Sequence, residues 1–250
     1  MAEDENEQST FTKPGFLAGA ALVAVLVIAG IVLTVVNVAG GDSDDTAATP
    51  APTSSSASAA PSAEPTADAG GTSVCGLRGE ELSGTLTTAP DAEWQYQETS
   101  AYPSSSDFGP AETSPDGYRY CFQHSPSGAL FAASNAVVQA FDNPGDSAWA
   151  GYFLSESTYR DELLAAPVDE GTANARLNIV GYRLLSYEGD TARVDVAMRG
   201  SAQGQTITAS AVYDLVWEAG DWKADTSVAE PFSFAVIPDT SGYTLFTAGG

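Results

Sequence analysis

Residues 121–141 read CFQHSPSGALFAASNAVVQAF, and this stretch decides how the chain folds. Ser125 is a preferred helix N-cap residue, and Pro126 suits the first helical position because that position needs no backbone N–H donor. From there, apolar residues recur at helical spacing on one face, namely Leu130, Ala133, Val137, Val138 and Phe141. The pattern predicts an amphipathic helix that ends at the breaker Asp142-Asn143-Pro144-Gly145.

Two shorter helices are expected next along the chain. Residues 148–154 form a short amphipathic stretch, and Ser155 is in position to cap a further helix over residues 156–165. Pro167 follows and would end that helix. The centre of the chain is therefore predicted to be helical.

After Gly171 the apolar period changes from helical spacing to the alternation of a strand. In residues 193–199 the side chains of Val194, Val196 and Met198 face one way, which is typical of a half-buried strand. Residues 206–217 alternate in the same manner, an earlier strand at 177–187 is more apolar on both faces, and 222–226 form a short last strand. Short Gly-containing hairpin loops lie between these runs. Helices followed by an antiparallel meander predict an α+β fold.

Upstream, residues 16–38 (FLAGAALVAVLVIAGIVLTVVNV) form an apolar run of 23 residues without a charge. A helix rises about 1.5 Å per residue, so this run can span a hydrocarbon core of roughly 30 Å. A cleaved signal peptide is the alternative, but its apolar region is usually about 7–15 residues long. Lys13 is the only basic residue close to the run. We therefore expect residues 1–15 in the cytoplasm and the chain after residue 38 outside the cell.

Residues 39–73, rich in Ala, Ser, Thr and Pro, predict a disordered linker. From residue 41 to residue 73 there is no aromatic residue and no Leu, Ile or Val, so the segment cannot bury enough apolar surface to fold. A flexible chain of this length averages about 30 Å end to end, which would hold a domain clear of the lipid. Residues 74–250 have the aromatic residues and the apolar periodicity of a single folded extracellular domain.

The predicted domain is strongly acidic. Residues 74–250 hold eight basic and 24 acidic side chains, and the whole chain has a formal net charge of -24. Such a surface repels phosphate backbones, and the sequence has no motif that reads RNA or DNA. Direct nucleic-acid binding is therefore not expected, and the acidity is explained by solubility outside the cell.

The two cysteines, Cys75 and Cys121, lie in the part of the chain that we expect outside the cytoplasm. There, an even count of two favours one disulfide, which would stabilise the fold by about 4 kcal/mol. Free thiols and a metal site are the alternatives; a cysteine nucleophile could use His124 as its base, and a structural zinc would want four ligands. We expect the chain's only histidine, His124, to be a capping or surface residue.

Three pieces of the chain carry a resemblance to known proteins: VCGL at residues 74–77, CFQHSPSGALFAASN at 121–135 and SGYTLF at 241–246. Behind an anchor and a spacer, this combination resembles an uncharacterised family of single-pass actinobacterial membrane proteins that are often associated with integrative and conjugative elements. The order of helices and a meander ending in VWEAGDWKAD (216–225) is similar to the cone of the nuclear transport factor 2-like superfamily. The resemblance implies helices packed on a curved antiparallel sheet.

The resemblance also implies a non-catalytic scaffold or assembly role, similar to the anchored cone domains that build conjugation and secretion channels. Expected partners are the lipid bilayer, through residues 16–38, and proteins of the cell envelope, which include further copies of the chain. No cofactor is expected. The long spacer and the acidity differ from a standard secretion component and oppose tight ring packing. An extracellular ligand- or cell-wall-binding domain is the alternative function.

An enzyme is the less favoured interpretation, because a cone fold can enclose an Asp base beside a Tyr donor. The nearest candidates are Tyr182, Asp195, Tyr213 and Asp214. Asp195 shares its strand face with Arg193 and Arg199, which predicts a solvated surface, while Tyr213 is expected in the core with Asp214 pointing the opposite way. The sequence also lacks a Gly-rich phosphate loop, a G-x-S-x-G elbow and clustered His or Cys ligands, so we expect no catalytic residue and no metal site.

The C-terminal segment at residues 231–246 (PFSFAVIPDTSGYTLF) is apolar for a chain end. We expect it to pack over an edge of the sheet, because an uncovered edge is a liability. Docking of a partner protein is the alternative role of this segment.

Overall fold

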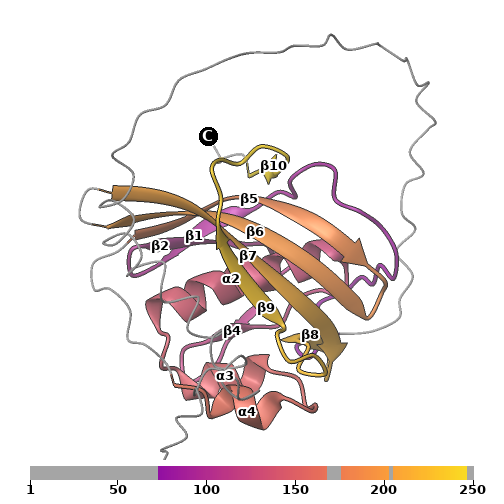
Figure 1. Cartoon of the computed structure of the whole chain (residues 1–250). Coiled ribbons are helices and arrows are strands. Elements are labelled where there is room, and N and C mark those ends of the chain that lie inside the picture. The colour runs from indigo at the N-terminus through magenta and orange to yellow at the C-terminus, as the bar shows by residue number, and fades with distance from the viewer. Residues whose placement is uncertain (1–72, 168–175, 203–204, 247–250) are drawn as a thin grey trace, which may run out of the picture.

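The computed structural model describes residues 73–167, 176–202 and 205–246 (Figure 1). Along the sequence, strands come both before and after the helices, and most of the sheet is formed by the strands that come after them. The α+β class predicted from the sequence is therefore confirmed. The elements are, in order, β1 (Glu93–Gln97), β2 (Ser100–Ser104), β3 (Glu112–Thr113), β4 (Arg119–Tyr120), α2 (Pro126–Asp142), α3 (Ser147–Phe153), α4 (Arg160–Leu164), β5 (Arg176–Tyr187), β6 (Thr191–Ala202), β7 (Gln205–Glu218), β8 (Asp221–Ala224), β9 (Phe232–Val236) and β10 (Thr244–Leu245).

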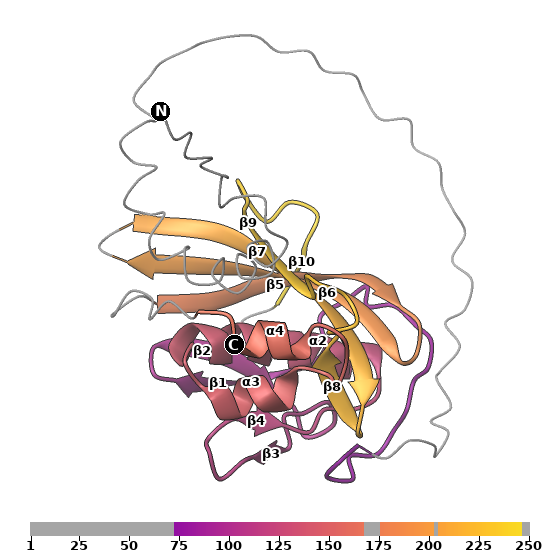
Figure 2. The same ribbon diagram turned by 60° about the horizontal axis from the view of Figure 1, so that its bottom comes forward.

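One curled and mostly antiparallel sheet forms the body of the molecule (Figure 2). Its strand order is β1-β2-β5-β6-β7-β8, while β10 pairs with β5 and β9 pairs with β7. The register between β5 and β6 shifts twice, between Ile179 and Gly181 and between Leu184 and Ser186. Bulges of this kind bend a strand and increase its twist, which accounts for the curl.

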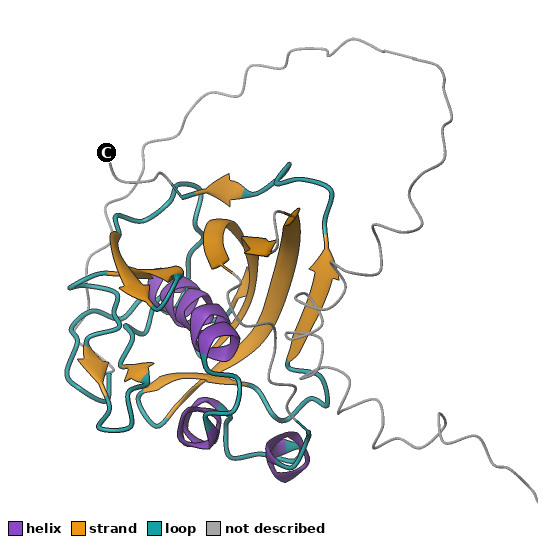
Figure 3. Cartoon of the chain, turned by 90° about the vertical axis from the view of Figure 1, so that its left-hand side faces the viewer, coloured by secondary structure: helices purple, strands orange, loops and turns teal. Residues whose placement is uncertain are grey.

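Helix α2 packs against one face of the sheet, which we call the inner face (Figure 3). Ser125 caps the helix as predicted, because its Oγ accepts a hydrogen bond from the backbone N–H of Gly128 at 3.0 Å, and Pro126 is the first helical residue. Gly128 is needed here, since a Cβ at this position would lie 1.8 Å from the carbonyl oxygen of Gln123. The helix ends at Asp142, the first residue of the predicted breaker.

The hydrophobic core lies between α2 and the inner face. Leu130 and Val138 of the helix are fully buried, and so are Val194 and Val196 of β6, the residues that the alternating pattern assigned to one face. Each large apolar side chain buried in this way contributes roughly 1.5–3 kcal/mol. The packing of α2 on β5, β6 and β7 is therefore a main source of stability.

Two short helices follow α2 and cover the end of the sheet near β8 (Figure 1). Helix α3 begins after Asp146, whose carboxylate accepts hydrogen bonds from the N–H groups of Ala148 and Trp149. Helix α4 is shorter than predicted, and Ser155 does not cap it. Instead, the Oγ of Ser155 accepts a hydrogen bond from the N–H of Thr226 at 2.9 Å, so the hydroxyl joins this segment to the end of β8.

The apolar C-terminal segment adds two strands to the sheet, one beside β7 and one beside β5. Strand β9 pairs with β7 from Phe232 opposite Tyr213 to Val236 opposite Ala209. The chain then crosses the outer face of the sheet, and β10 pairs with β5. The ring of Phe246 lies 5.4 Å from that of Trp94 and 5.2 Å from that of Tyr182, centroid to centroid. Packing of this segment at the sheet edges is thereby confirmed.

The strands before α2 were not predicted. Strands β1 and β2 form an antiparallel hairpin that joins the main sheet through Ala101 of β2, and β3 and β4 form a small separate ladder. The predicted tail (1–15), span (16–38) and linker (39–73) lie outside the described residues, except for Ser73, which is buried in the domain. Among the helices that the structure describes, none is long and apolar enough to cross a membrane.

Candidate functional site

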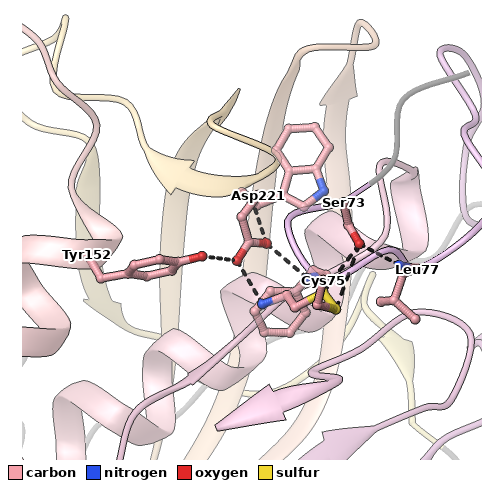
Figure 4. The surroundings of a disulfide bond; sticks show 8 residues. Ser73, Cys75, Leu77, Tyr152 and Asp221 are labelled. Carbon is pink, nitrogen blue, oxygen red and sulfur yellow. Dashed lines mark hydrogen bonds between the residues drawn. A yellow bond between two sulfur atoms is a disulfide. The ribbon is translucent and has the colours of Figure 1, made fainter. Parts of the chain in front are cut away.

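The predicted disulfide between Cys75 and Cys121 is present, with its Cα atoms 5.9 Å apart (Figure 4). Cys121 is fully buried, whereas Cys75 lies at the surface. The Oγ of Ser73 lies 3.3 Å from the Cys121 sulfur and accepts a hydrogen bond from the N–H of Leu77. The two cysteine sulfurs are bonded to each other, so neither is available as a nucleophile or as a metal ligand.

A buried carboxylate, Asp221, holds the chain in place beside the disulfide (Figure 4). It accepts hydrogen bonds from the N–H of Cys121 at 2.8 Å, the N–H of Phe122 at 2.9 Å and the hydroxyl of Tyr152 at 2.7 Å. Burial raises the pKa of Asp221, and these hydrogen bonds oppose that shift. Because its oxygens are taken up by structural donors, this carboxylate fixes the hairpin β7–β8 to the start of α2.

Lys223, two residues further along β8, is a second buried charge. Its Nζ lies 2.9 Å from the ring centroid of Tyr152 and donates to the carbonyl oxygen of the same residue at 2.7 Å. Burial lowers the pKa of Lys223 to about 8, which would make it a competent nucleophile or base if a substrate reached it. The tyrosine ring covers the amine, so the arrangement favours a structural role.

The sequence suggested that His124 is a capping or surface residue, and this prediction is wrong. The residue is buried and only 2% exposed. Its ring stacks on Trp217 with 4.1 Å between the centroids. Its Nδ1 lies 2.9 Å from Glu80 Oε1, and its Nε2 lies 3.1 Å from Asp190 Oδ1. A carboxylate lies close to each nitrogen, so the imidazole sits between the N-terminal segment and the β5–β6 turn. Neither contact has the geometry of a hydrogen bond, and the contacts act through charge and packing.

The residues weighed as acid–base candidates do not meet in one site. Tyr182 and Tyr213 are buried on the inner face, and Tyr213 was expected there. Asp195 pairs with Val212 and lies on the outer face, and Asp214 is half-buried on that same side. The thickness of the sheet therefore separates the candidate bases from the candidate tyrosine donors.

Asp195 is nevertheless buried, so the predicted solvated surface is wrong at this position. Its carboxylate accepts hydrogen bonds from Arg183 Nε at 3.0 Å, from the Ser210 hydroxyl at 2.6 Å and from the Tyr243 hydroxyl at 2.9 Å. The guanidinium of Arg183 also lies over the Tyr243 ring, 4.3 Å from its centroid. The C-terminal segment, which carries Tyr243, is what covers the outer face here. We call these four side chains the Asp195 clasp.

Helix α2 carries a polar stripe that was not predicted from the sequence. Asn135 and Gln139 are buried and, with Asp142, follow each other at helical spacing. The buried guanidinium of Arg119 donates from Nε to Asn135 Oδ1 at 2.7 Å and lies 3.8 Å from the centroid of the Tyr102 ring. Burial lowers the pKa of Arg119 to about 10.

Two buried atoms here lack a hydrogen-bond partner within the described part of the chain: Oδ2 of Asp142 in the stripe and Nη2 of its neighbour Arg119. Burial raises the pKa of the Asp142 carboxyl, a shift that the hydrogen bond from Ser100 opposes. Buried atoms of this kind are usually satisfied by an ordered water or a bound polar group. A spacing of four and three between Asn135, Gln139 and Asp142 was the only signal in the sequence.

An apolar recess lies between α3 and the strands β7 and β9. Its volume is about 40 Å³, well below the roughly 150 Å³ that holds a benzene ring. It is partly open to the surface, and its size suits a single apolar side chain. Its lining consists of Ala140, Trp149, Ala150, Phe153, Leu154, Tyr213 and Phe232.

Metal chemistry finds no support in residues 73–167, 176–202 and 205–246, where no group of three or more His, Cys, Asp and Glu side chains could hold an ion. No curated protein and no solved structure matches the chain. A family model described as a domain of unknown function, DUF8175, matches residues 51–245. This match covers most of the chain, including every described strand and helix, and the chain therefore belongs to the DUF8175 family.

Proposed function

We propose that this chain is a single-pass membrane protein whose folded domain acts outside the cell as a non-catalytic scaffold or assembly module. The Cys75–Cys121 disulfide carries the proposal, because disulfides persist in oxidising compartments and are rare in the cytosol. Cys75 is exposed, so cytosolic reductants would have access to this bond. The uncharged run at residues 16–38 would deliver the domain to an oxidising exterior.

The position of the disulfide supports a tethered domain. It joins the residues that follow the proposed linker directly to Cys121, which lies five residues before the start of α2, across a sequence separation of 46. A pull on the linker would then act on the core through Cys121 and would not peel away β1–β4. A domain held by an anchor at its N-terminal end benefits from such a connection.

The finer fold that we propose is a cone of the nuclear transport factor 2-like kind. The curl of the long strands β5–β7 and the packing of α2 on their inner face support it. The recess of about 40 Å³ beside β7 and β9 is too small for a substrate larger than a few atoms, which favours a role at the surface over a reaction in that recess. Conjugation or secretion machinery is the setting we propose, on the strength of the resemblance at residues 74–77, 121–135 and 241–246.

A ligand- or cell-wall-binding domain is the second candidate. The apolar recess favours it, because Trp149 and Phe153 stack beside an opening at the surface. A binding domain of this kind can work as a monomer, whereas a scaffold must contact other envelope proteins or further copies of itself. The state of the protein in the membrane therefore distinguishes the two candidates.

Intact cells that make the full chain provide the test of location. We expect added protease to digest residues 74–250 while residues 1–15 stay protected, and we expect a maleimide to label neither cysteine before reduction. A double variant, Cys75→Ser with Cys121→Ser, is the control for the labelling. Protection of the C-terminal part, or two alkylated thiols in the native protein, would refute the proposed location.

Chemical cross-linking in the same cells tests the scaffold role. We expect adducts that contain the chain together with envelope proteins or further copies of itself. A chain that stays uncross-linked at every reagent concentration, while an envelope complex of known composition is cross-linked in the same cells, argues for the second candidate.

A further inference from the structure

Strand β9 (Phe232–Val236) leaves one edge of the sheet open, because it pairs with β7 alone among the described strands (Figure 1). The N–H of Asp214 donates to Pro231 O at 2.7 Å, and the N–H of Ile237 donates to Thr208 O at 3.0 Å. Backbone groups alternate along a strand, so residues 231, 233, 235 and 237 turn theirs toward β7. The N–H and C=O groups of Phe232, Phe234 and Val236 therefore point away from β7. Phe232 is buried, whereas Phe234 is half-buried and Val236 is exposed, so the open part of the edge is its C-terminal half.

This edge lacks the features that normally keep sheet edges apart. Natural edge strands carry charges, internal prolines or bulges. The sequence of β9 is FSFAV, and its register with β7 is continuous, so it has none of these. Phe and Val also favour strands, and the side chain of Val236 is 55% exposed.

The absence of charge along this edge favours contact between two copies of the domain. Residues 231–238 (PFSFAVIP) carry no charge, although residues 74–250 hold 24 acidic and eight basic side chains. Two such domains repel each other over most of their surface, and this repulsion is least where neither copy presents a charge. Antiparallel pairing about a two-fold axis brings this neutral segment against itself.

The apolar recess adjoins the edge. Phe232 belongs both to β9 and to the lining of the recess, together with Trp149 and Phe153 of α3. Because Phe232 lies opposite Tyr213, the side chains of Phe234 and Val236 are directed to the same inner side. A strand added at the edge would place its own apolar side chains on this side, next to the recess.

We propose that the β9 edge is a self-association surface, on which β9 of a second copy pairs antiparallel and continues the sheet. Main-chain hydrogen bonds supply the contact, as in other cases of strand addition, and the apolar inner side adds specificity. This deepens the assembly role proposed above and rests on it for its biological purpose. Its test does not depend on where the domain lies in the cell.

The experiment compares variants of the full chain in detergent micelles by sedimentation velocity over a concentration series. Val236→Pro removes an N–H that points to the open edge and leaves the hydrogen bonds to β7 in place. Val236→Thr keeps that N–H and is its control. Val236→Lys puts a charge on the edge, and Leu82→Lys, at a side chain that is also 55% exposed, controls for the added charge.

We expect the parent chain, Val236→Thr and Leu82→Lys to dimerise alike, and Val236→Pro and Val236→Lys to weaken dimerisation by about tenfold or more. Circular dichroism checks that each variant is folded, and Val236→Lys carries the test if Val236→Pro is not. A parent chain that stays monomeric at every concentration overturns the proposal. So does a dimer that Val236→Lys leaves unchanged.

A distance measurement separates pairing at β9 from contact between the N-terminal segments. Ser233 is exposed on the outer face, and Ser233→Cys gives a single free thiol for a nitroxide label because the native cysteines are bonded to each other. Paired strands lie about 4.8 Å apart, so labels in a β9 dimer should fall within about 25 Å of each other. A dimer without such a short distance overturns the proposal. Protease accessibility does not enter either measurement, so this proposal and the proposed location can fail separately.

Discussion

At the scale of single residues, Lys223 combines burial with a charge in a way that pH can reveal. The side chain is 5% exposed, and burial lowers its pKa to about 8, whereas the pKa of a lysine in an unfolded chain is about 10.4. Between these values the folded protein binds fewer protons than the unfolded chain, so the free energy of unfolding rises with pH. We predict that Lys223 adds about 2 kcal/mol to this free energy between pH 8 and pH 10, measured by urea denaturation.

Lys223→Met is the control for this prediction, because it keeps the length of the side chain and cannot titrate. Buried tyrosines act in the opposite sense, since a raised pKa destabilises the fold at high pH. Burial raises the pKa of Tyr182 to about 12, and a tyrosine in an unfolded chain titrates at about 10, so this effect begins near the upper end of the window and is shared by Lys223→Met. A rise of equal size in Lys223→Met would contradict the assignment.

Residues with distant partners are where prediction from the sequence failed. The alternation in β6 correctly assigned Val194 and Val196 to the core but left Asp195 exposed. Asp195 is buried because Tyr243, which is 48 positions away, covers it. His124 is buried because Glu80, Asp190 and Trp217 surround it. Local periodicity shows which face of a strand is apolar, but not which later segment covers the other face.

At the scale of elements, the N-cap of α2 can be tested with a matched pair of serines. Ser125 is buried and accepts a hydrogen bond from the N–H of Gly128, so Ser125→Ala should lower the free energy of unfolding by about 1 kcal/mol. Ser134 is a buried serine of the same helix, and its Oγ has no partner within the described residues. Ser134→Ala should be neutral or slightly stabilising, because it removes an unpaired hydroxyl.

Chemical denaturation of both serine variants provides the measurement. Equal losses of stability would show that the volume of the side chain matters at these sites and that the cap does not. A loss confined to Ser134→Ala would reverse the assignment of roles between the two serines.

The elements that could be predicted are those with strong local signals. Helix α2 has a cap, a proline and an apolar face, and β6 and β7 have long alternating runs with Gly-containing turns before and after them. Strands β3 and β4 have two residues each, and they exist through their pairing with each other, so no periodic pattern identifies them. Helix α4 lost its predicted first turn because Ser155 bonds to Thr226, a tertiary contact that outweighs its preference for a cap.

At the scale of the whole molecule, the chain is fastened near both ends of the described region. The Cys75–Cys121 disulfide holds the N-terminal side to the core. On the C-terminal side, the Asp195 clasp holds the chain on the outer face, β10 pairs with β5, and the ring of Phe246 packs against Trp94 and Tyr182. The sequence predicted the disulfide from a count of two cysteines, and it predicted packing of the tail from its apolar character. The path across the outer face could not be predicted, because it depends on the curl of the finished sheet.

Removal of residues 241–250 tests the contribution of this C-terminal fastening. The deletion takes away Phe246, whose ring contacts Trp94 and Tyr182, and it takes the Tyr243 hydroxyl from the buried carboxylate of Asp195. We predict a loss of about 3 kcal/mol in the free energy of unfolding, from the apolar burial and from the hydrogen bond to a charged group.

Tyr243→Phe removes that hydrogen bond alone and should cost about 1–2 kcal/mol. Urea denaturation of the parent chain and both variants decides the matter. Because β9 lies outside the deletion, dimerisation should persist in the truncated chain at a urea concentration where it is still folded. Unchanged stability would mean that β10 and the Asp195 clasp rest on an outer face that the rest of the domain already stabilises.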